Sequence, residues 1–161
     1  MSTISIATLK RMSRDTLAAL LQATGTPPAK VAVIDVRDSG TFPPAPRTKT
    51  RLLTRDVQDH VGGHIHSSTW VPSSTLDVRM PELVRTLKDK EKVVFHCALS
   101  QQRGPSAALQ YARERERVYG PEESHKQEVY VLEGGFVQWQ EKYGKDTRLT
   151  EAYAEDIWRE Y

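Results

Sequence analysis

The chain has 161 residues, of which 38% are hydrophobic, an amount that suits one compact domain and leaves little material for a second. Its 23 Lys and Arg side chains nearly balance 21 Asp and Glu side chains, so net charge gives no reason to expect a nucleic-acid or membrane partner. A single cysteine, Cys97, excludes an intrachain disulfide and a zinc site built on cysteine pairs.

No uncharged stretch approaches the roughly 20 apolar residues of a membrane-spanning helix. Residues 1–10 are polar and lack the apolar core of a signal peptide. We therefore expect a cytoplasmic protein, with the nucleus as a second compartment that the sequence leaves open.

The first half of the chain contains one helical pattern and one strand pattern. Ser13 precedes an apolar face formed by leucines, which predicts a short amphipathic helix that Gly25 ends. Residues 31–36 are β-branched and nearly all apolar, as expected of a buried parallel strand. Residues 39–59 have no clear period and predict an exposed loop insertion. Its basic residues are Arg47, Lys49, Arg51 and Arg55.

The second half alternates strands and helices more regularly. Residues 70–72 predict a brief extended segment, and Pro81 predicts the start of a helix. Residues 93–95 and 128–132 predict two further strands. Between them a helix is expected from Arg103 to Gly120, its residues 113–117 forming a solvated, charged surface. Two more helices are expected, from Gly135 to Gly144 and over the tail at about 147–161.

Short strands separated by helices predict an α/β domain with a central, mostly parallel sheet flanked by helices on both faces. We assign residues 1–161 to this one domain, with its core at about 4–144. Ligands in such folds bind beyond the carboxyl ends of the strands.

The segment between Cys97 and Arg103 has the features of an oxyanion site at such a strand end. Cys97 directly follows a predicted strand, and Arg103 lies six positions further along, at the start of a helix. Backbone N–H groups of such a loop can converge on one point, where the helix N-terminus adds positive potential. Arg103 can close the rim with two parallel hydrogen bonds to a tetrahedral oxyanion. The predicted oxyanion-binding residues are Ala98, Leu99, Ser100, Gln101, Gln102 and Arg103.

The same amides and helix dipole favour a thiolate at Cys97, which is the predicted nucleophile. Ser100 is expected to donate a hydrogen bond to the sulfur as it leaves, so Cys97, Arg103 and Ser100 form the predicted catalytic set. His96 and Asp35 are expected to support it. A free cysteine at a strand end is ordinarily a small buried hydrophobe, but the small and hydrophilic loop favours the catalytic interpretation.

Several separated motifs resemble those of rhodanese-fold domains in the same order. Residues 33–37 (VIDVR) resemble the strand that opens the family's core, and residues 62–65 (GGHI) with Val71-Pro72 resemble its glycine-histidine-isoleucine segment. Residues 129–136 (VYVLEGGF) with Trp139 resemble its closing strand and helix. The chain thus resembles a single rhodanese-fold domain over about residues 4–144.

The loop length points to one branch of that family. Sulfurtransferases of the family usually carry a six-residue loop, whereas the loop here has seven residues, as in M-phase-inducer phosphatases and eukaryotic arsenate reductases. The cell-cycle phosphatases typically carry Glu directly after the cysteine. Ala98 stands at that position here, and this makes the loop more similar to those of the arsenate reductases and small phosphatases. The insertion at 39–59 is longer than the corresponding segment of the family usually is.

Four functions follow from the resemblance and the loop. The first is a phosphatase for phosphoesters, including phosphotyrosine or dual-specificity substrates, with a phosphocysteine intermediate and with Asp35 or Asp38 as general acid by position only. The second is an arsenate reductase that uses glutathione or glutaredoxin as external reductant and needs no other cofactor. Thiosulfate sulfur transfer and a non-catalytic anion-binding module are the third and fourth.

Three histidines and two tryptophans are expected to have structural roles. His60, His64 and His66 lie close in sequence, but no carboxylate cluster or second thiol accompanies them, so no metal site is expected. Trp70 and Trp139 are expected in the core, because both lie in segments with counterparts in the fold.

Overall fold

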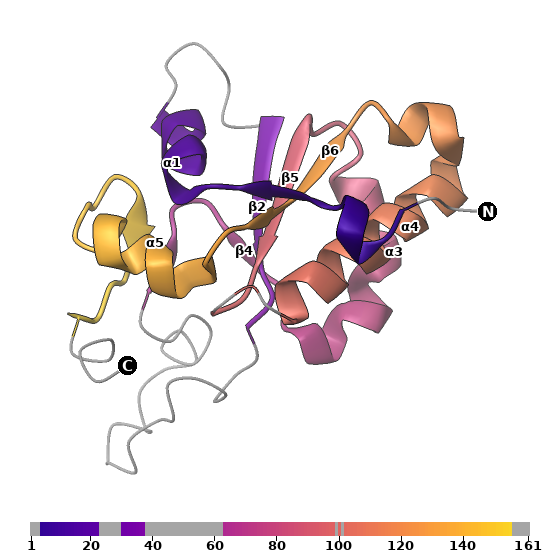
Figure 1. Ribbon diagram of the computed structural model, residues 1–161. Helices are drawn as coiled ribbons and strands as arrows, with labels where there is room; N and C mark the ends of the chain where they lie inside the picture. The colour runs from indigo at the N-terminus through magenta and orange to yellow at the C-terminus, as the bar shows by residue number, and fades with distance from the viewer. Residues whose placement is uncertain (1–3, 23–29, 38–62, 99, 101, 156–161) are drawn as a thin grey trace.

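The structure, a computed structural model, describes residues 4–22, 30–37, 63–98, 100 and 102–155 (Figure 1). The elements in chain order are η1 (Ile6–Thr8), β1 (Lys10–Met12), α1 (Arg14–Gln22), β2 (Val31–Asp35), β3 (His64–Ile65), β4 (Thr69–Trp70), η4 (Ser73–Thr75), α3 (Leu76–Thr86), β5 (Lys92–His96), α4 (Arg103–Ser124), β6 (Glu128–Leu132), α5 (Gly135–Tyr143) and β7 (Thr150–Glu151). None of the described helices is long and apolar enough to cross a membrane.

The main sheet has five strands in the order β1-β6-β5-β2-β4, and every pair in it is parallel. This confirms the predicted α/β class. Strands β2 and β5 lie side by side in the sheet, and their register pairs Asp35 with His96. Because both residues end their strands, they meet at the carboxyl edge of the sheet, directly before Cys97.

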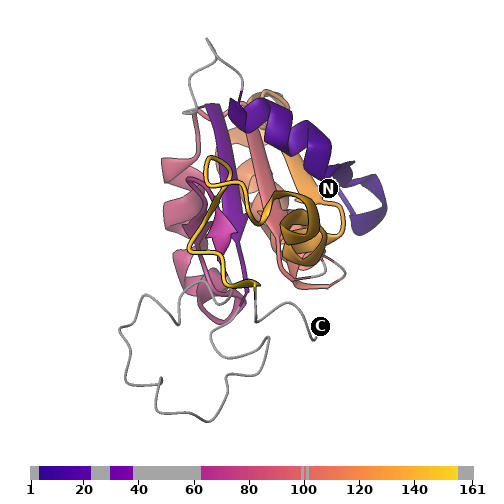
Figure 2. The same ribbon diagram turned by 90° about the vertical axis from the view of Figure 1, so that its left-hand side faces the viewer.

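Apolar side chains cover both faces of this sheet. Alternate residues of β2 and β5 point to opposite faces, as the pleat requires. Ile34 and Phe95 pack in the cluster that includes α3 and α4, whereas Val33 and Val94 pack in the cluster that includes α1 and α5. Figure 2 shows helices on both sides of the strands. Two buried faces explain why the strands read as continuous apolar runs rather than alternating ones.

Helix α3 begins earlier than the sequence predicted. Pro81 lies inside α3, which starts at Leu76 directly after the η4 turn, so the expectation that Pro81 opens this helix is wrong. A proline there removes one backbone hydrogen bond, and the buried Leu76 and Met80 on the preceding turn offset that loss by packing against the sheet.

Helix α4 confirms its predicted start at Arg103 and its break at Gly120, where φ is 86° and the helical path is interrupted. The prediction that residues 113–117 are all solvated is wrong for Arg115, which is 1% exposed. Its guanidinium donates to the carbonyl oxygens of Lys88 (3.3 Å) and Glu123 (3.0 Å). Arg115 therefore joins the turn after α3 to the end of α4.

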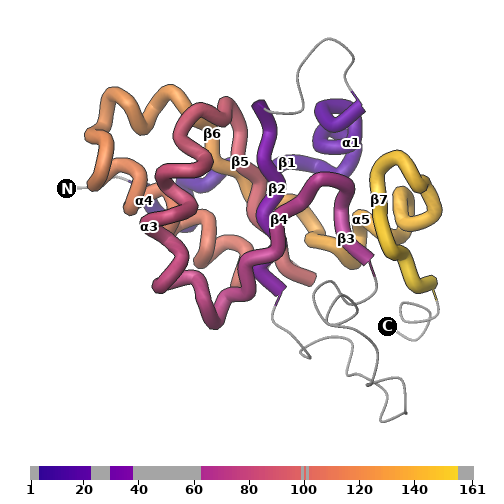
Figure 3. The backbone as a smooth tube through the Cα atoms, turned by 180° about the vertical axis from the view of Figure 1, so that it is seen from behind, coloured from indigo at the N-terminus to yellow at the C-terminus, as the bar shows by residue number. Residues whose placement is uncertain are grey.

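The chain after α5 does not continue as the expected helix over 147–155. Residues 150–151 form β7, which pairs antiparallel with β3 (Figure 3). The cause is local packing: Leu149 is buried in the core, and the indole nitrogen of Trp139 donates to Thr150 Oγ1 over 2.9 Å. The rest of the predicted tail helix and the 39–59 insertion lie outside the described residues.

Candidate active site

Cys97 directly follows β5 at the carboxyl edge of the sheet and is 7% exposed. The backbone amide of Ser100 donates to the Cys97 Sγ over 3.1 Å. The loop thus folds back over its first residue, as expected for a loop whose amides gather around the sulfur. Leu99 and Gln101 of the predicted loop lie outside the described residues.

The first turn of α5 fixes the carbonyl groups of the loop. The Phe136 amide donates to the Cys97 carbonyl oxygen over 3.0 Å, and the Val137 amide donates to that of Ala98 over 2.9 Å. These two hydrogen bonds tie the Cys97 and Ala98 carbonyl groups to the start of α5.

Gly135 makes this approach possible. Its φ is +60°, a backbone conformation that residues with a side chain rarely adopt. A Cβ there would lie 2.3 Å from the Ala98 carbonyl oxygen. Glycine is therefore required at position 135, where α5 meets the loop.

The far end of the loop leads into α4. Gln102 is the N-cap residue, and Arg103, the first residue of the helix, is exposed. Ser100 is 1% exposed with φ at +56°, and its hydroxyl has no hydrogen-bond partner among the described residues. A Cβ on Gly104 would lie 3.4 Å from that hydroxyl oxygen and 3.4 Å from the Cys97 nitrogen, so α4 packs closely against the loop at this position.

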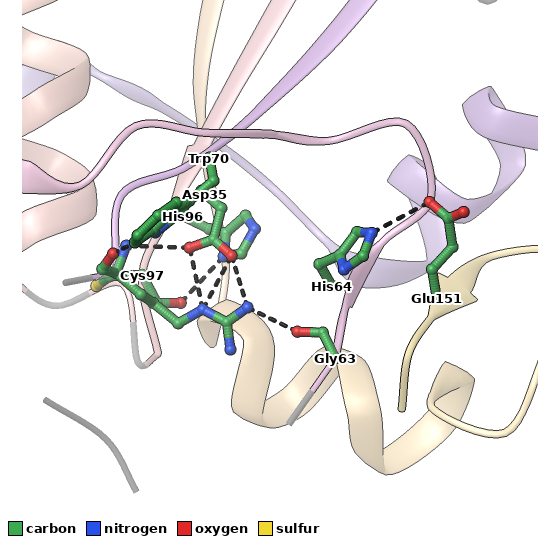
Figure 4. Close-up of polar contacts among 8 residues, drawn as sticks. Asp35, Gly63, His64, Trp70, His96, Cys97 and Glu151 are labelled. Carbon is green, nitrogen blue, oxygen red and sulfur yellow. Dashed lines mark hydrogen bonds and ion pairs between the residues drawn. The ribbon is translucent and has the colours of Figure 1, made fainter. Parts of the chain in front are cut away.

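Asp35 is fully buried at the end of β2 and is paired with Arg37, which is 5% exposed (Figure 4). Arg37 donates through Nε to both carboxylate oxygens (3.0 and 2.9 Å) and through Nη2 to Oδ2 (2.6 Å). Burial, the largest influence, raises the pKa of Asp35, but the Arg37 charge and the hydrogen bonds from Arg37 together outweigh it and hold this pKa below its ordinary value. Asp35 is therefore an ionised structural partner and a poor proton donor.

His96 is fully buried, beside Asp35 on the neighbouring strand and directly before Cys97 in the sequence. Burial, the largest influence, and the nearby Arg37 lower the pKa of His96, so its ring is neutral near pH 7. Its Nδ1 lies 3.1 Å from the Cys97 carbonyl oxygen, which assigns the single ring proton to Nδ1. The expected supporting residues are thus brought to the loop, whereas Asp38 lies outside the described residues.

Arg37 is the residue at this site that the sequence analysis gave no role. Besides its ion pair with Asp35, it donates through Nη2 to the Gly63 carbonyl oxygen over 2.7 Å, and the Trp70 indole donates to the Arg37 carbonyl oxygen over 2.7 Å. An arginine two residues after an aspartate at the end of a buried strand was the available signal. Trp70 itself is only half-buried, while Trp139 is in the core as predicted.

His64 and His66 lie away from Cys97 and contact one carboxylate. His64 Nε2 is 3.2 Å from Glu151 Oε1, across the β3–β7 pair (Figure 4). His66 Nδ1 is 3.5 Å from the same oxygen. Within the described ranges, no group of three or more His, Cys, Asp or Glu side chains is arranged to hold a metal ion. His60 lies outside those ranges.

Comparison with protein-family models gives a match to the rhodanese-like domain over residues 13–142. The chain belongs to the rhodanese family. Its fold and the resemblance seen in its motifs are thereby confirmed.

Two curated relatives belong to the phosphatase and arsenate reductase branch of the family. A CDC25-like phosphatase of Saccharomyces cerevisiae is 40% identical over 112 residues, which cover 63% of this chain and 72% of that protein. An arsenate reductase of Oryza sativa subsp. japonica is 38% identical over 135 residues, which cover 84% of this chain and 72% of that protein.

Solved structures point to the same two activities. A yeast protein tyrosine phosphatase of the rhodanese family matches with a TM-score of 0.68 and 32% identity, covering 98% of this chain and 100% of that one. An As-Sb reductase from Leishmania major matches with a TM-score of 0.60 and 29% identity, covering 86% and 81%. These relatives confirm the branch that the loop length indicated, and with it the expectation of an enzyme.

Proposed function

We propose that this chain is a cysteine-dependent phosphatase that acts on phosphoesters through a phosphocysteine intermediate. The observation that carries the proposal is the loop geometry: the Ser100 amide donates to the Cys97 Sγ while α5 binds the loop carbonyls. This arrangement places a backbone amide of the loop on the sulfur and fixes the peptides that follow Cys97. The match to a yeast phosphatase over nearly the whole chain supports the same function.

In the first step the Cys97 thiolate attacks phosphorus in line with the leaving group. The S–P bond forms, the bond to the leaving oxygen breaks, and that oxygen takes a proton. The loop amides and the Arg103 guanidinium bind the equatorial oxygens as their charge is redistributed. In the second step water attacks phosphorus, phosphate leaves, and the Cys97 thiolate returns, stabilised by Ser100.

The leaving-group proton does not come from Asp35 in this proposal. That carboxylate is ionised, buried and bound on both oxygens by Arg37. Two kinds of substrate avoid the need for a proton from Asp35: a monoanionic phosphoester that carries its own proton, and an aryl phosphate whose phenolate leaves readily. The proposal therefore favours phosphotyrosine-like substrates over alkyl phosphates.

Arsenate reduction is the second candidate, and the rice and Leishmania relatives favour it. The Cys97 thiolate would add to arsenate with loss of water. A glutathione thiol would then attack the Cys97 sulfur, reducing arsenic by two electrons, releasing arsenite and forming a mixed disulfide. A second glutathione or glutaredoxin thiol would restore Cys97, because the chain has no other cysteine to do so.

Three assays on one preparation separate these functions. They are hydrolysis of para-nitrophenyl phosphate, arsenate reduction with glutathione and glutaredoxin, and sulfur transfer from thiosulfate to cyanide, each with Cys97→Ser as control. The proposal expects Cys97-dependent phosphate release as the fastest reaction. Faster arsenate turnover would make the second candidate correct, and sulfur transfer alone would overturn both.

A further inference from the structure

Arg37 contacts an aromatic ring as well as a carboxylate and a carbonyl. Its guanidinium carbon lies 4.5 Å from the centre of the Phe136 ring, within the range of a cation–π interaction. Asp35 and the Gly63 carbonyl hold the guanidinium from other directions through hydrogen bonds. Because Arg37 and Phe136 are both buried, water does not compete for this contact.

Phe136 carries this contact to the reactive loop. Its backbone amide is the donor to the Cys97 carbonyl oxygen, at 3.0 Å. Its ring also stacks with the His96 ring, with centroids 6.2 Å apart and planes at 24°. A ring fixed by two neighbours limits the movement of the amide on the same residue.

We propose that Arg37 and Phe136 form a positioning pair for the active-site loop. The guanidinium holds the ring in place, and the placed residue directs its amide to the Cys97 carbonyl. The direction of the Cys97–Ala98 peptide, and with it the oxyanion-facing edge of the loop, thus depends on a contact made outside the loop. For turnover this inference rests on the proposed function, but for oxyanion binding it does not.

The first test is Phe136→Leu, which removes the ring face and leaves the backbone amide. Phe95→Leu is the matched control, because Phe95 is equally buried but packs against Tyr111 on the opposite face of the sheet. For each variant we would measure kcat and KM for para-nitrophenyl phosphate, the affinity for orthovanadate by titration calorimetry, and the midpoint of thermal unfolding.

If the two residues act as a positioning pair, Phe136→Leu should lower kcat/KM by roughly 10- to 100-fold and weaken vanadate binding. Small displacements of catalytic groups reduce the rate by this amount. Phe95→Leu should lower the unfolding midpoint similarly and change both constants far less. Equal kinetic and binding constants for the two folded variants would overturn the proposal. A wild type that hydrolyses no phosphoester would overturn the proposed function, while the vanadate comparison would still decide the role of the ring.

A second variant, Arg37→Lys, keeps a cation near Asp35 but loses the planar face that stacks on the ring. We expect Arg37→Lys and Phe136→Leu to be non-additive in vanadate affinity, because each removes the same contact. Additive losses would contradict the pair. If Arg37→Lys does not fold, the comparison of the two phenylalanine variants remains decisive.

Discussion

The Ser100 backbone amide donates to the Cys97 Sγ over 3.1 Å, while the Ser100 hydroxyl has no partner among the described residues. The two polar groups of one residue are thus expected to act at different steps. The amide stabilises the attacking thiolate, and the hydroxyl is available to the sulfur when phosphocysteine is hydrolysed.

Ser100→Ala should therefore keep the first chemical step and slow the second. Because the amide remains, the rapid burst of para-nitrophenol should have the rate of the wild type, followed by a steady state reduced by roughly 10²-fold. Stopped-flow absorbance measures both phases. Ser106→Ala, on the exposed side of α4, is the control. A lost burst would show that the hydroxyl acts in the first step.

Arg103→Lys should lower kcat by roughly 10²–10³-fold although the charge is kept, since Lys cannot make two parallel hydrogen bonds to the equatorial oxygens. Steady-state kinetics with para-nitrophenyl phosphate would measure it. Arg113→Lys, further along α4, is the matched control. A fully active Arg103→Lys would mean that only the charge of Arg103 matters.

Gly135→Ala should displace the loop, because its Cβ would meet the Ala98 carbonyl oxygen. Gly120→Ala is a close control: Gly120 also has a positive φ, of +86°, but nothing lies within 4 Å of its Cβ position. Both variants should lose about 1–3 kcal/mol of unfolding free energy from backbone strain, and Gly135→Ala should lose more because its Cβ also overlaps the loop. Only Gly135→Ala should weaken vanadate binding, and equal affinities would contradict the role of α5.

Asp35→Asn should destabilise the fold by about 3–5 kcal/mol at pH 7, because it leaves the buried Arg37 charge without its partner. The folded-state pKa of Asp35 lies below its unfolded value of about 3.9. Its contribution is therefore present above that unfolded value and is lost as pH falls through the folded-state pKa. Urea unfolding at several pH values should give a shallower acid dependence for the variant than for the wild type.

The same variant tests whether Asp35 is a general acid. Since the carboxylate is buried and ionised, Asp35→Asn should leave the dependence of kcat/KM on leaving-group pKa unchanged in the folded fraction. A series of aryl phosphates measures this slope. A much steeper slope in Asp35→Asn would show that Asp35 does donate the proton.

Much of this fold could be predicted from local patterns. The buried strands at 31–35, 92–96 and 128–132 are apolar on both faces, and the helix start at Arg103 follows from the residues around it. The loop between Cys97 and Arg103 was recognisable because its chemistry lies in consecutive residues.

The features that sequence reasoning missed depend on distant contacts. Strand β1 has three residues and β7 has two residues, and each strand has one buried side chain. Neither is long enough to show an alternating pattern in the sequence. Arg115 lies in a charged stretch, and its burial depends on two carbonyl groups, on Lys88 and Glu123. Arg37 has a partner two residues away, but its contacts with Gly63 and Phe136 exist only in the folded chain.

In the proposed reaction Cys97 forms the covalent intermediate. The most direct test is mass spectrometry of the enzyme acid-quenched during turnover of para-nitrophenyl phosphate, with peptide mapping of any phosphoryl adduct. We predict an adduct on the peptide that carries Cys97, and neither adduct nor turnover in Cys97→Ser. Phosphate on another residue, or full turnover by Cys97→Ser, would show that Cys97 is not the nucleophile.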